Sequence, residues 1–272
     1  MINNPDNKEK ELAAFFNEKA EQYNNVSFIK DDPISIPHRF NVMQDIEIAG
    51  FFAAILAWGN RTSIINSCNR LMSLMDNRPY QFILALKHQS PDKLMMLTRF
   101  VHRTFNGTDL LYLIDFLHYH YAIKGETSLE TAFTKGLNPA DTDTENALNG
   151  FRQYVFSQEI CDEIPQRTKK HIAAPYKKSA CKRLNMYLRW MVRDDDKGVD
   201  FGLWKTIKSS QLVCPVDLHV ARVAKRFNIL DRKQTDWQAA IELTNYLKKL
   251  DAQDPVKYDF ALFGLGVIEK YC

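Results

Sequence analysis

The sequence predicts an all-α fold, and three observations support this prediction. Apolar residues recur at three- and four-residue intervals along most of the 272-residue chain, which is the period of an amphipathic helix. Residues that cap helices, mainly Asp and Ser, stand at the beginning of these segments. No Asn-Gly turn between alternating strands occurs. Strand content is therefore expected to be near zero.

The composition is that of a soluble globular protein. Hydrophobic residues make up 45% and charged residues 25% of the chain, which is enough to form a core. No apolar run approaches the ~18 residues that a membrane span needs, and the polar segment Met1 to Glu11 has no secretory character. We expect a cytoplasmic protein without a membrane partner.

The first predicted helices follow from caps and periodicity. Asp45 caps a largely apolar helix that ends near Trp58, where Gly59 stops it. This helix is expected to be central and buried. Thr62 or Ser63 opens the next helix, and its apolar stripe contains Ile64, Ile65, Cys68, Leu71, Met72 and Met75.

The remaining helices are read in the same way. Asp109 begins one, Ser128 begins one that ends near Gly136, and residues 147–155 form another after a loop at 138–144. Further along the chain, four residues are expected to begin helices: Ser179, Asp217, Asp236 and Asp254, the last followed by Pro255 in the first turn.

The order of these helices predicts an N-terminal extension over residues 1–44 and two helical lobes over residues 45–160 and 161–272. Either lobe can be discontinuous in sequence, and a cleft is expected between them. A plain helical bundle is the alternative. Nothing in the pattern requires a partner chain, so a monomer is expected.

Positive charge is concentrated near the middle of the chain. The net charge is only +3, yet the segment from Arg167 to Arg193 holds nine basic residues and no acid. The members are Arg167, Lys169, Lys170, Lys177, Lys178, Lys182, Arg183, Arg189 and Arg193. Such a local field suits a polyanion such as nucleic acid, although a solvated basic face is the plainer interpretation.

Two residues, one in this segment and one after it, are candidates for chemistry. Asp217 follows Pro215-Val216 at a helix start, where free amides hold a carboxylate ionised and fixed in direction. Lys182 falls at the third position of a helix counted from Ser179, away from the apolar face of that helix. The helix dipole and neighbouring cations favour a neutral amine there, which is a nucleophile. An ordinary cap and an ordinary surface lysine are the alternatives.

The segment Pro215-Val216-Asp217-Leu218-His219-Val220 resembles the Val-Asp-x-His-Val stretch of the helix-hairpin-helix DNA glycosylases. That superfamily includes endonuclease III and 8-oxoguanine DNA glycosylase, and the chain is most similar to a bacterial branch of it. Lys182 is similar to the family's catalytic lysine, and Asp217 matches its catalytic aspartate. The segment from Glu47 to Leu74 also resembles the family's first helix pair.

The resemblance implies a two-lobed helical glycosylase fold and a function in base-excision repair. The enzyme would remove damaged bases, oxidised purines among them, from double-stranded DNA, and Lys182 would form a Schiff base that permits strand cleavage. DNA contacts are expected from the residues Lys177, Lys178, Ser179, Arg183, His219 and Arg222. A non-catalytic DNA- or RNA-binding protein of the same fold is the alternative, and a helical interaction protein with an incidental basic patch is a third.

The chain departs from the family pattern in three places. The stretch before Lys182, residues 173–180, has no glycine, whereas the family's hairpin reads Leu-Pro-Gly-Val-Gly. Lys182 and Asp217 are 35 residues apart, which is longer than usual, so Gly198 to Gln211 is expected to be an insertion with a short helix at Phe201 to Ile207. The clustered cysteines of the endonuclease III branch are absent, since the chain holds only Cys68, Cys161, Cys181, Cys214 and Cys272.

Other candidate features favour structural roles. His118 and His120 are two residues apart in a helical pattern and do not share a face, so neither a metal site nor a cofactor is predicted. The glycines of Gly264-Leu265-Gly266 are expected to permit close packing rather than to bind phosphate. The tryptophans are expected in the core, unless one stacks on a flipped base, namely Trp58, Trp190, Trp204 and Trp237.

Overall fold

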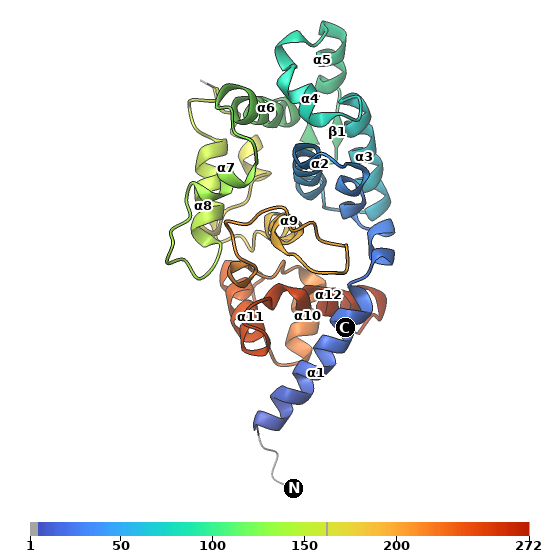
Figure 1. The fold of residues 1–272 in the computed structure, drawn as a ribbon, viewed down its shortest axis with the longest axis vertical. Helices are drawn as coiled ribbons and strands as arrows, with labels where there is room; N and C mark the ends of the chain where they lie inside the picture. Colours follow the sequence, from blue (N-terminus) through green and yellow to red (C-terminus); the bar gives the residue numbers. More distant parts are fainter. Residues whose placement is uncertain (1–4, 162, 272) are drawn as a thin grey trace. The chain divides into compact units, whose positions relative to one another are not determined.

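The computed structural model describes residues 5–161 and 163–271, and within these residues the protein is all-α, as predicted (Figure 1). The only sheet in this part of the chain joins two strands of two residues each, β1 (Val101–His102) and β2 (Phe105–Asn106), which pair antiparallel. Cys272 lies outside the described residues.

The chain divides into two compact units, neither of which is continuous in sequence. Unit 1 takes its described residues from 5–28, 140–144 and 174–271. Unit 2 comprises residues 29–139 and 145–173, of which all but residue 162 are described.

Unit 1 has five α-helices among its described residues. They are α1 (Pro5–Tyr23), α9 (Lys182–Val192), α10 (Leu218–Arg226), α11 (Trp237–Leu250) and α12 (Tyr258–Phe263). Both α1 and α10 pack against α12. The core of this unit is aromatic, with Phe16, Tyr187, Trp190, Trp204 and Tyr258 all buried.

Unit 2 is built around a buried helix. Its α-helices are α2 (Met43–Ile55), α3 (Arg61–Leu74), α4 (Pro79–Leu84), α5 (Pro91–Thr98), α6 (Gly107–His118), α7 (Glu130–Thr134) and α8 (Glu145–Val155). Every residue of α2 from Ile46 to Ile55 is buried, which confirms the predicted central helix. Even Glu47 is enclosed, and its carboxylate accepts hydrogen bonds from the Tyr121 hydroxyl at 2.8 Å and the Leu129 amide at 3.1 Å.

The predicted caps of unit 2 were partly wrong. Asp45 lies inside the first turn of α2 and does not cap it. Its carboxylate instead accepts a hydrogen bond from the amide of Tyr80 at 2.8 Å, at the beginning of α4. Likewise Asn106, not Asp109, is the N-cap of α6, and Asp109 completes a capping box with it. An acidic side chain near a helix start thus identified the helix but not its first residue.

The predicted insertion helix is also absent. Residues 201–207 form no helix, and a short 3₁₀ turn at Ser209–Gln211 follows. This segment is held by the end of α9, since the amides of Phe201 and Trp204 donate to the carbonyls of Trp190 and Met191 at 2.7 and 2.8 Å. Its apolar side chains are therefore fixed by long-range packing rather than by helical periodicity.

The residues expected to have structural roles mostly have them. Trp190, Trp204 and Trp237 are buried, while Trp58 is half-buried between the rings of His102 and His171. A β-carbon on Gly264 would lie 2.1 Å from the Tyr23 ring, and one on Gly266 would lie 3.2 Å from His219, so the predicted close packing is confirmed.

The two histidines of the His118-x-His120 pair face separate partners. The Nδ1 atom of His118 lies 2.8 Å from the carbonyl of Ile83, and the Nε2 atom of His120 lies 3.0 Å from the carbonyl of Ser128. Both side chains therefore serve packing within unit 2.

Candidate active site

Lys182 and Asp217 meet in unit 1. Lys182 is the first residue of α9, and Asp217 is the N-cap of α10. The Nζ atom of Lys182 lies 3.6 Å from Oδ2 of Asp217, and the two side chains are 30% and 25% exposed. The pair is thus accessible to a ligand, yet each member is fixed at one end by the start of a helix.

The carboxylate of Asp217 has two distinct oxygen atoms. Oδ1 accepts hydrogen bonds from the amides of His219 at 2.9 Å and Val220 at 3.0 Å, which confirms the predicted cap. Oδ2 faces the amine of Lys182. Because the helix amides hold one oxygen, the direction of the other is set in advance, as electrostatic stabilisation of a developing cation requires.

The turn before α9 is tight although it contains no glycine. A 3₁₀ turn at Pro175–Lys177 is followed by Lys178 with φ of 60°, and Cys181 has φ of 50°. Both residues adopt the left-handed conformation that glycine normally supplies. The backbone thus makes a tight turn before α9 without the glycines that the family's hairpin contains.

Ser179 does not cap α9, although the sequence predicted it as the N-cap. The N-cap of α9 is Cys181, and Lys182 is therefore the first rather than the third helical residue. Ser179 forms an isolated antiparallel bridge with Asp236, and its hydroxyl accepts a hydrogen bond from the amide of Cys181 at 3.2 Å. The left-handed turns place the helix start later than the cap residue suggests.

The predicted DNA contacts differ in their exposure. Lys177, Lys178, His219 and Arg222 are exposed, and all four belong to the two segments that begin α9 and α10. Arg183 is half-buried, and burial lowers the pKa of its guanidinium to about 10. The exposed four are the better candidates for contact with a phosphate backbone.

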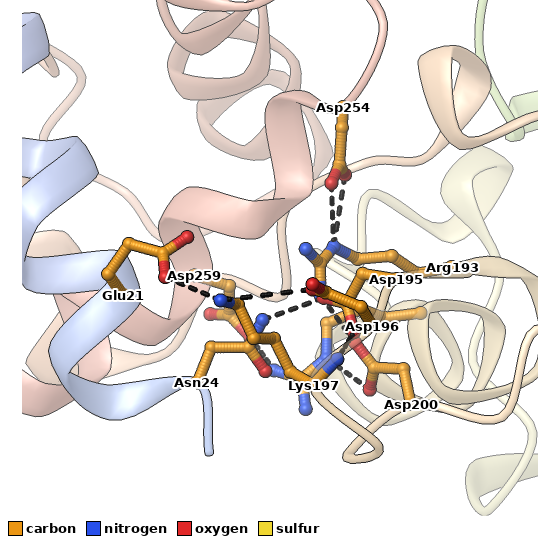
Figure 2. Close-up of polar contacts among 10 residues, drawn as sticks. Glu21, Asn24, Arg193, Asp195, Asp196, Lys197, Asp200, Asp254 and Asp259 are labelled. Atoms are coloured by element: carbon orange, nitrogen blue, oxygen red, sulfur yellow. Dashed lines mark hydrogen bonds and ion pairs between the residues drawn. The ribbon is translucent and has the colours of Figure 1, made fainter.

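Two of the nine basic residues point into the protein and not toward a partner. Arg189 and Arg193 are each 3% exposed. Arg193 contacts Asp195 at 2.7 Å, Asp200 at 3.1 Å and Asp254 at 2.9 Å (Figure 2). The positive charge at the surface of this segment is therefore smaller than its count of nine basic residues suggests.

The charge network around Arg193 joins three segments of unit 1 (Figure 2). Asp195 accepts a hydrogen bond from the Asn24 side chain, beside the end of α1, at 2.7 Å. Lys197 contacts Glu21 of α1 at 2.7 Å. Asp254, which was predicted to cap a helix, has no side-chain cap bond and accepts from Arg193 instead. The network thus fixes the C-terminal end of α9 against α1 and the residues before α12.

The sequence analysis did not single out Asp259, a buried carboxylate of α12 that joins this network through Arg189. Arg189 contacts Asp200 at 3.2 Å and Asp259 of α12 at 2.5 Å. Asp259 is 5% exposed, and burial raises the pKa of its carboxyl to about 6, against the lowering effects of Arg189 and Lys182. The only sequence signal for Asp259 is that an aspartate stands in the first turn of a helix that is otherwise largely apolar.

Within residues 5–161 and 163–271, no group of three or more His, Cys, Asp or Glu side chains is arranged to hold a metal ion. None of the helices in this same part of the chain combines the length and apolarity that crossing a membrane requires.

Comparison with known proteins gives one result. No curated protein and no solved structure matches the chain. The profile of one family, described as "Protein of unknown function (DUF2400)", matches residues 32–268. That match covers most of the chain, including the Lys182–Asp217 pair, Asp259 and parts of both units, and the chain therefore belongs to the DUF2400 family.

Proposed function

We propose that this protein is a DNA base-excision repair enzyme, a glycosylase with abasic-site lyase activity, and that its fold is of the helix-hairpin-helix glycosylase type. The observation that supports this proposal is the contact between Lys182 Nζ and Asp217 Oδ2 at 3.6 Å, at the beginnings of two helices. These are the two residues that the sequence resemblance assigns to catalysis.

The substrate would be a damaged base, with oxidised purines as first candidates, extruded from double-stranded DNA. Cleavage of the N-glycosidic bond builds positive charge on the sugar, and the oriented carboxylate of Asp217 would stabilise that charge. The neutral amine of Lys182 would attack C1′ of the sugar, and the base would leave with the electron pair of the broken bond and take up a proton.

The lyase step would follow from the bond between Nζ and C1′. Loss of the ring oxygen from C1′ opens the sugar and leaves a protonated Schiff base. Removal of a C2′ proton then expels the 3′ phosphate, and water hydrolyses the Schiff base to release the enzyme. Lys177, Lys178, His219 and Arg222 would contact phosphates, which supplies affinity but no choice of base.

Borohydride trapping tests this proposal. Purified protein is incubated with duplex DNA that carries an abasic site or an oxidised guanine, and borohydride reduces any Schiff base to a stable adduct. Lys182→Ala is compared with Lys205→Ala, since Lys205 is a surface lysine of the same unit that also pairs with an aspartate.

An adduct in the wild type and the Lys205→Ala variant, but not in Lys182→Ala, is the expected result. Duplex binding that is salt-sensitive, without an adduct or base release on any lesion, would overturn the enzymatic proposal and favour the non-catalytic DNA- or RNA-binding protein. Absence of nucleic-acid binding would favour the helical interaction protein.

A further inference from the structure

A second loop of unit 1 lies beside the turn before α9. Ser179, which follows that turn, forms an isolated antiparallel bridge with Asp236, the N-cap of α11. Residues paired in this way have their Cα atoms about 5 Å apart. The bridge therefore brings residues 231–235, the pre-α11 loop, close to the exposed side chains of Lys177 and Lys178, the first lysine pair, although the two segments are far apart in the sequence.

The pre-α11 loop is fixed by contacts with α11. Oε1 of Glu242 accepts hydrogen bonds from the amides of Asp231 at 2.6 Å and Arg232 at 3.4 Å. The guanidinium of Arg232 donates to both carboxylate oxygens of Asp236, at 2.6 and 2.7 Å. Asp236 also accepts a hydrogen bond from the amide of Ala239 at 3.1 Å. The backbone of the loop is thus held in place at both of its ends.

A second lysine pair stands at this loop. The Nζ atom of Lys225, on α10, donates a hydrogen bond to the carbonyl of Lys233 at 3.0 Å. The side chain of Lys233 is exposed, and that of Lys225 is half-buried. Because a carbonyl carries no net charge, this bond restrains the ammonium group of Lys225 without neutralising it. Two cations are therefore held together at the pre-α11 loop.

The first and the second lysine pair are close enough to contact one DNA backbone. The chain from residue 233 to residue 236 spans at most about 10 Å, and the bridge adds about 5 Å. The backbones of Lys233 and Lys178 are therefore within about 20 Å of each other. One strand of duplex DNA carries a phosphate for every ~3.4 Å of helix axis, so both pairs fit within about six consecutive phosphates of a strand.

The other charged groups at this surface also favour an anionic partner. Arg222 of α10 is exposed. The carboxylate of Asp236 faces Arg232, and that of Glu242 faces backbone amides. Among residues 231–236, Asp231 is the only exposed acid. Positive charge thus predominates where the turn before α9 and the pre-α11 loop meet, as a polyanion requires.

We propose that the pre-α11 loop is a second phosphate-contacting element of the DNA interface. Lys225 and Lys233 bind the backbone of the duplex beside the phosphates that the first lysine pair contacts, and the bridge between Ser179 and Asp236 joins the two elements into one surface. The choice of double-stranded DNA as the partner rests on the proposed function. Contacts of this kind supply affinity and orientation but no choice of base.

The salt dependence of DNA binding tests this proposal. The full-length protein is titrated against a fluorescent duplex that carries one abasic site, and the anisotropy is measured at several salt concentrations. Lys225→Ala and Lys233→Ala are each expected to reduce the slope of log K against log salt by about 1. Lys205→Ala is the control and is expected to keep the wild-type slope, since Lys205 pairs with the exposed Asp194.

A variant of opposite sign sharpens the test. Asp231→Asn removes the exposed negative charge of the loop, while the hydrogen bond to Glu242 is made by the backbone amide and is kept. Its affinity for the duplex is expected to rise, and this gain is expected to shrink as salt screens the charges. A loss of affinity in folded Asp231→Asn would count against a phosphate backbone at the loop.

The outcomes separate this inference from the proposed function. Unchanged slopes in Lys225→Ala and Lys233→Ala would overturn the second phosphate-contacting element, even if borohydride trapping succeeds. Slopes reduced as expected, but without any trapped adduct, would refute the enzymatic proposal and support the DNA-binding surface. A wild type that does not bind the duplex would refute both. If Lys225→Ala does not fold, as judged by circular dichroism, Lys233→Ala decides, because Lys233 enters the bond with Lys225 through its carbonyl.

Discussion

The amine of Lys182 lies 3.6 Å from Oδ2 of the Asp217 carboxylate, while Oδ1 of the same carboxylate accepts two amide hydrogen bonds from α10. Cap and charge are therefore separable functions of one side chain. The amides require an acceptor in this position, but only a carboxylate adds the negative charge that faces Lys182.

Substitution of Asp217 can separate these functions. Asn is as good an N-cap as Asp, so Asp217→Asn is expected to keep the free energy of unfolding within about 0.5 kcal/mol of the wild type, whereas Asp217→Ala is expected to cost about 1 kcal/mol. Both variants lose the charge, so both are expected to lower the rate of base release ~100-fold or more. Urea unfolding and single-turnover kinetics measure the two effects. An Asp217→Asn enzyme with full activity would refute the electrostatic role.

The left-handed turn before α9 gives a second prediction. Lys178 has φ of 60°, a conformation that is an outlier for β-branched residues. Lys178→Val is expected to destabilise the protein by about 1–2 kcal/mol, whereas Lys178→Gly is expected to be tolerated. Lys177→Val, in the 3₁₀ turn, is the matched control, and urea unfolding is the measurement. Equal losses at positions 177 and 178 would argue against the described turn.

The exposed lysines of the same turn are expected to contribute to DNA affinity. If Lys177 and Lys178 each contact a phosphate, the double variant Lys177→Ala/Lys178→Ala weakens duplex binding and reduces the slope of log K against log salt by about 1 for each lysine. The slope is measured by fluorescence anisotropy at several salt concentrations. Lys205→Ala serves as the control. An unchanged slope would place the DNA-binding surface elsewhere.

Asp259 is expected to make stability depend on pH with a defined sign. Its pKa is raised in the folded protein, from 3.8 to about 6, so the native state binds the proton more tightly than the unfolded chain does. The stabilising contribution is thus fully present below about pH 3.8 and is lost as the pH rises through about 6, in all by about 3 kcal/mol.

The comparison of wild type with Asp259→Asn isolates this effect. The free energy of unfolding of the wild type, relative to the variant, is expected to fall between pH 4 and pH 7. A difference that stays constant over this range, or rises with pH, would show that the carboxyl of Asp259 is not held in its protonated form by burial.

The sequence predicted those features that depend on short segments. The helix starts at Asp217 and Asp236 are confirmed, because each aspartate caps the helix that follows it. The contact between Lys182 and Asp217 was expected only through the family resemblance. The error at Ser179 has a local cause, since left-handed residues at 178 and 181 delay the helix, and composition gives no sign of them.

The features that the sequence did not predict depend on long-range pairing. Arg189 and Arg193 counted as part of a surface charge, yet both are buried, and the partner of Arg189 on α12 is 70 residues away. Asp45 is similar, because its carboxylate accepts from Tyr80 and not from its own helix. The tertiary fold determines the partners of such side chains, because it brings together residues that are far apart in the sequence.

Lys182 is the proposed nucleophile, and peptide mass spectrometry of a borohydride-reduced adduct can identify the lysine that attacks the sugar. Wild-type protein is trapped on duplex DNA with a single abasic site, digested, and searched for the lysine that carries the sugar fragment. The added mass is expected on Lys182. An adduct on Lys177 or Lys178 with Lys182 unmodified, or no adduct from a protein that binds the duplex, would contradict it.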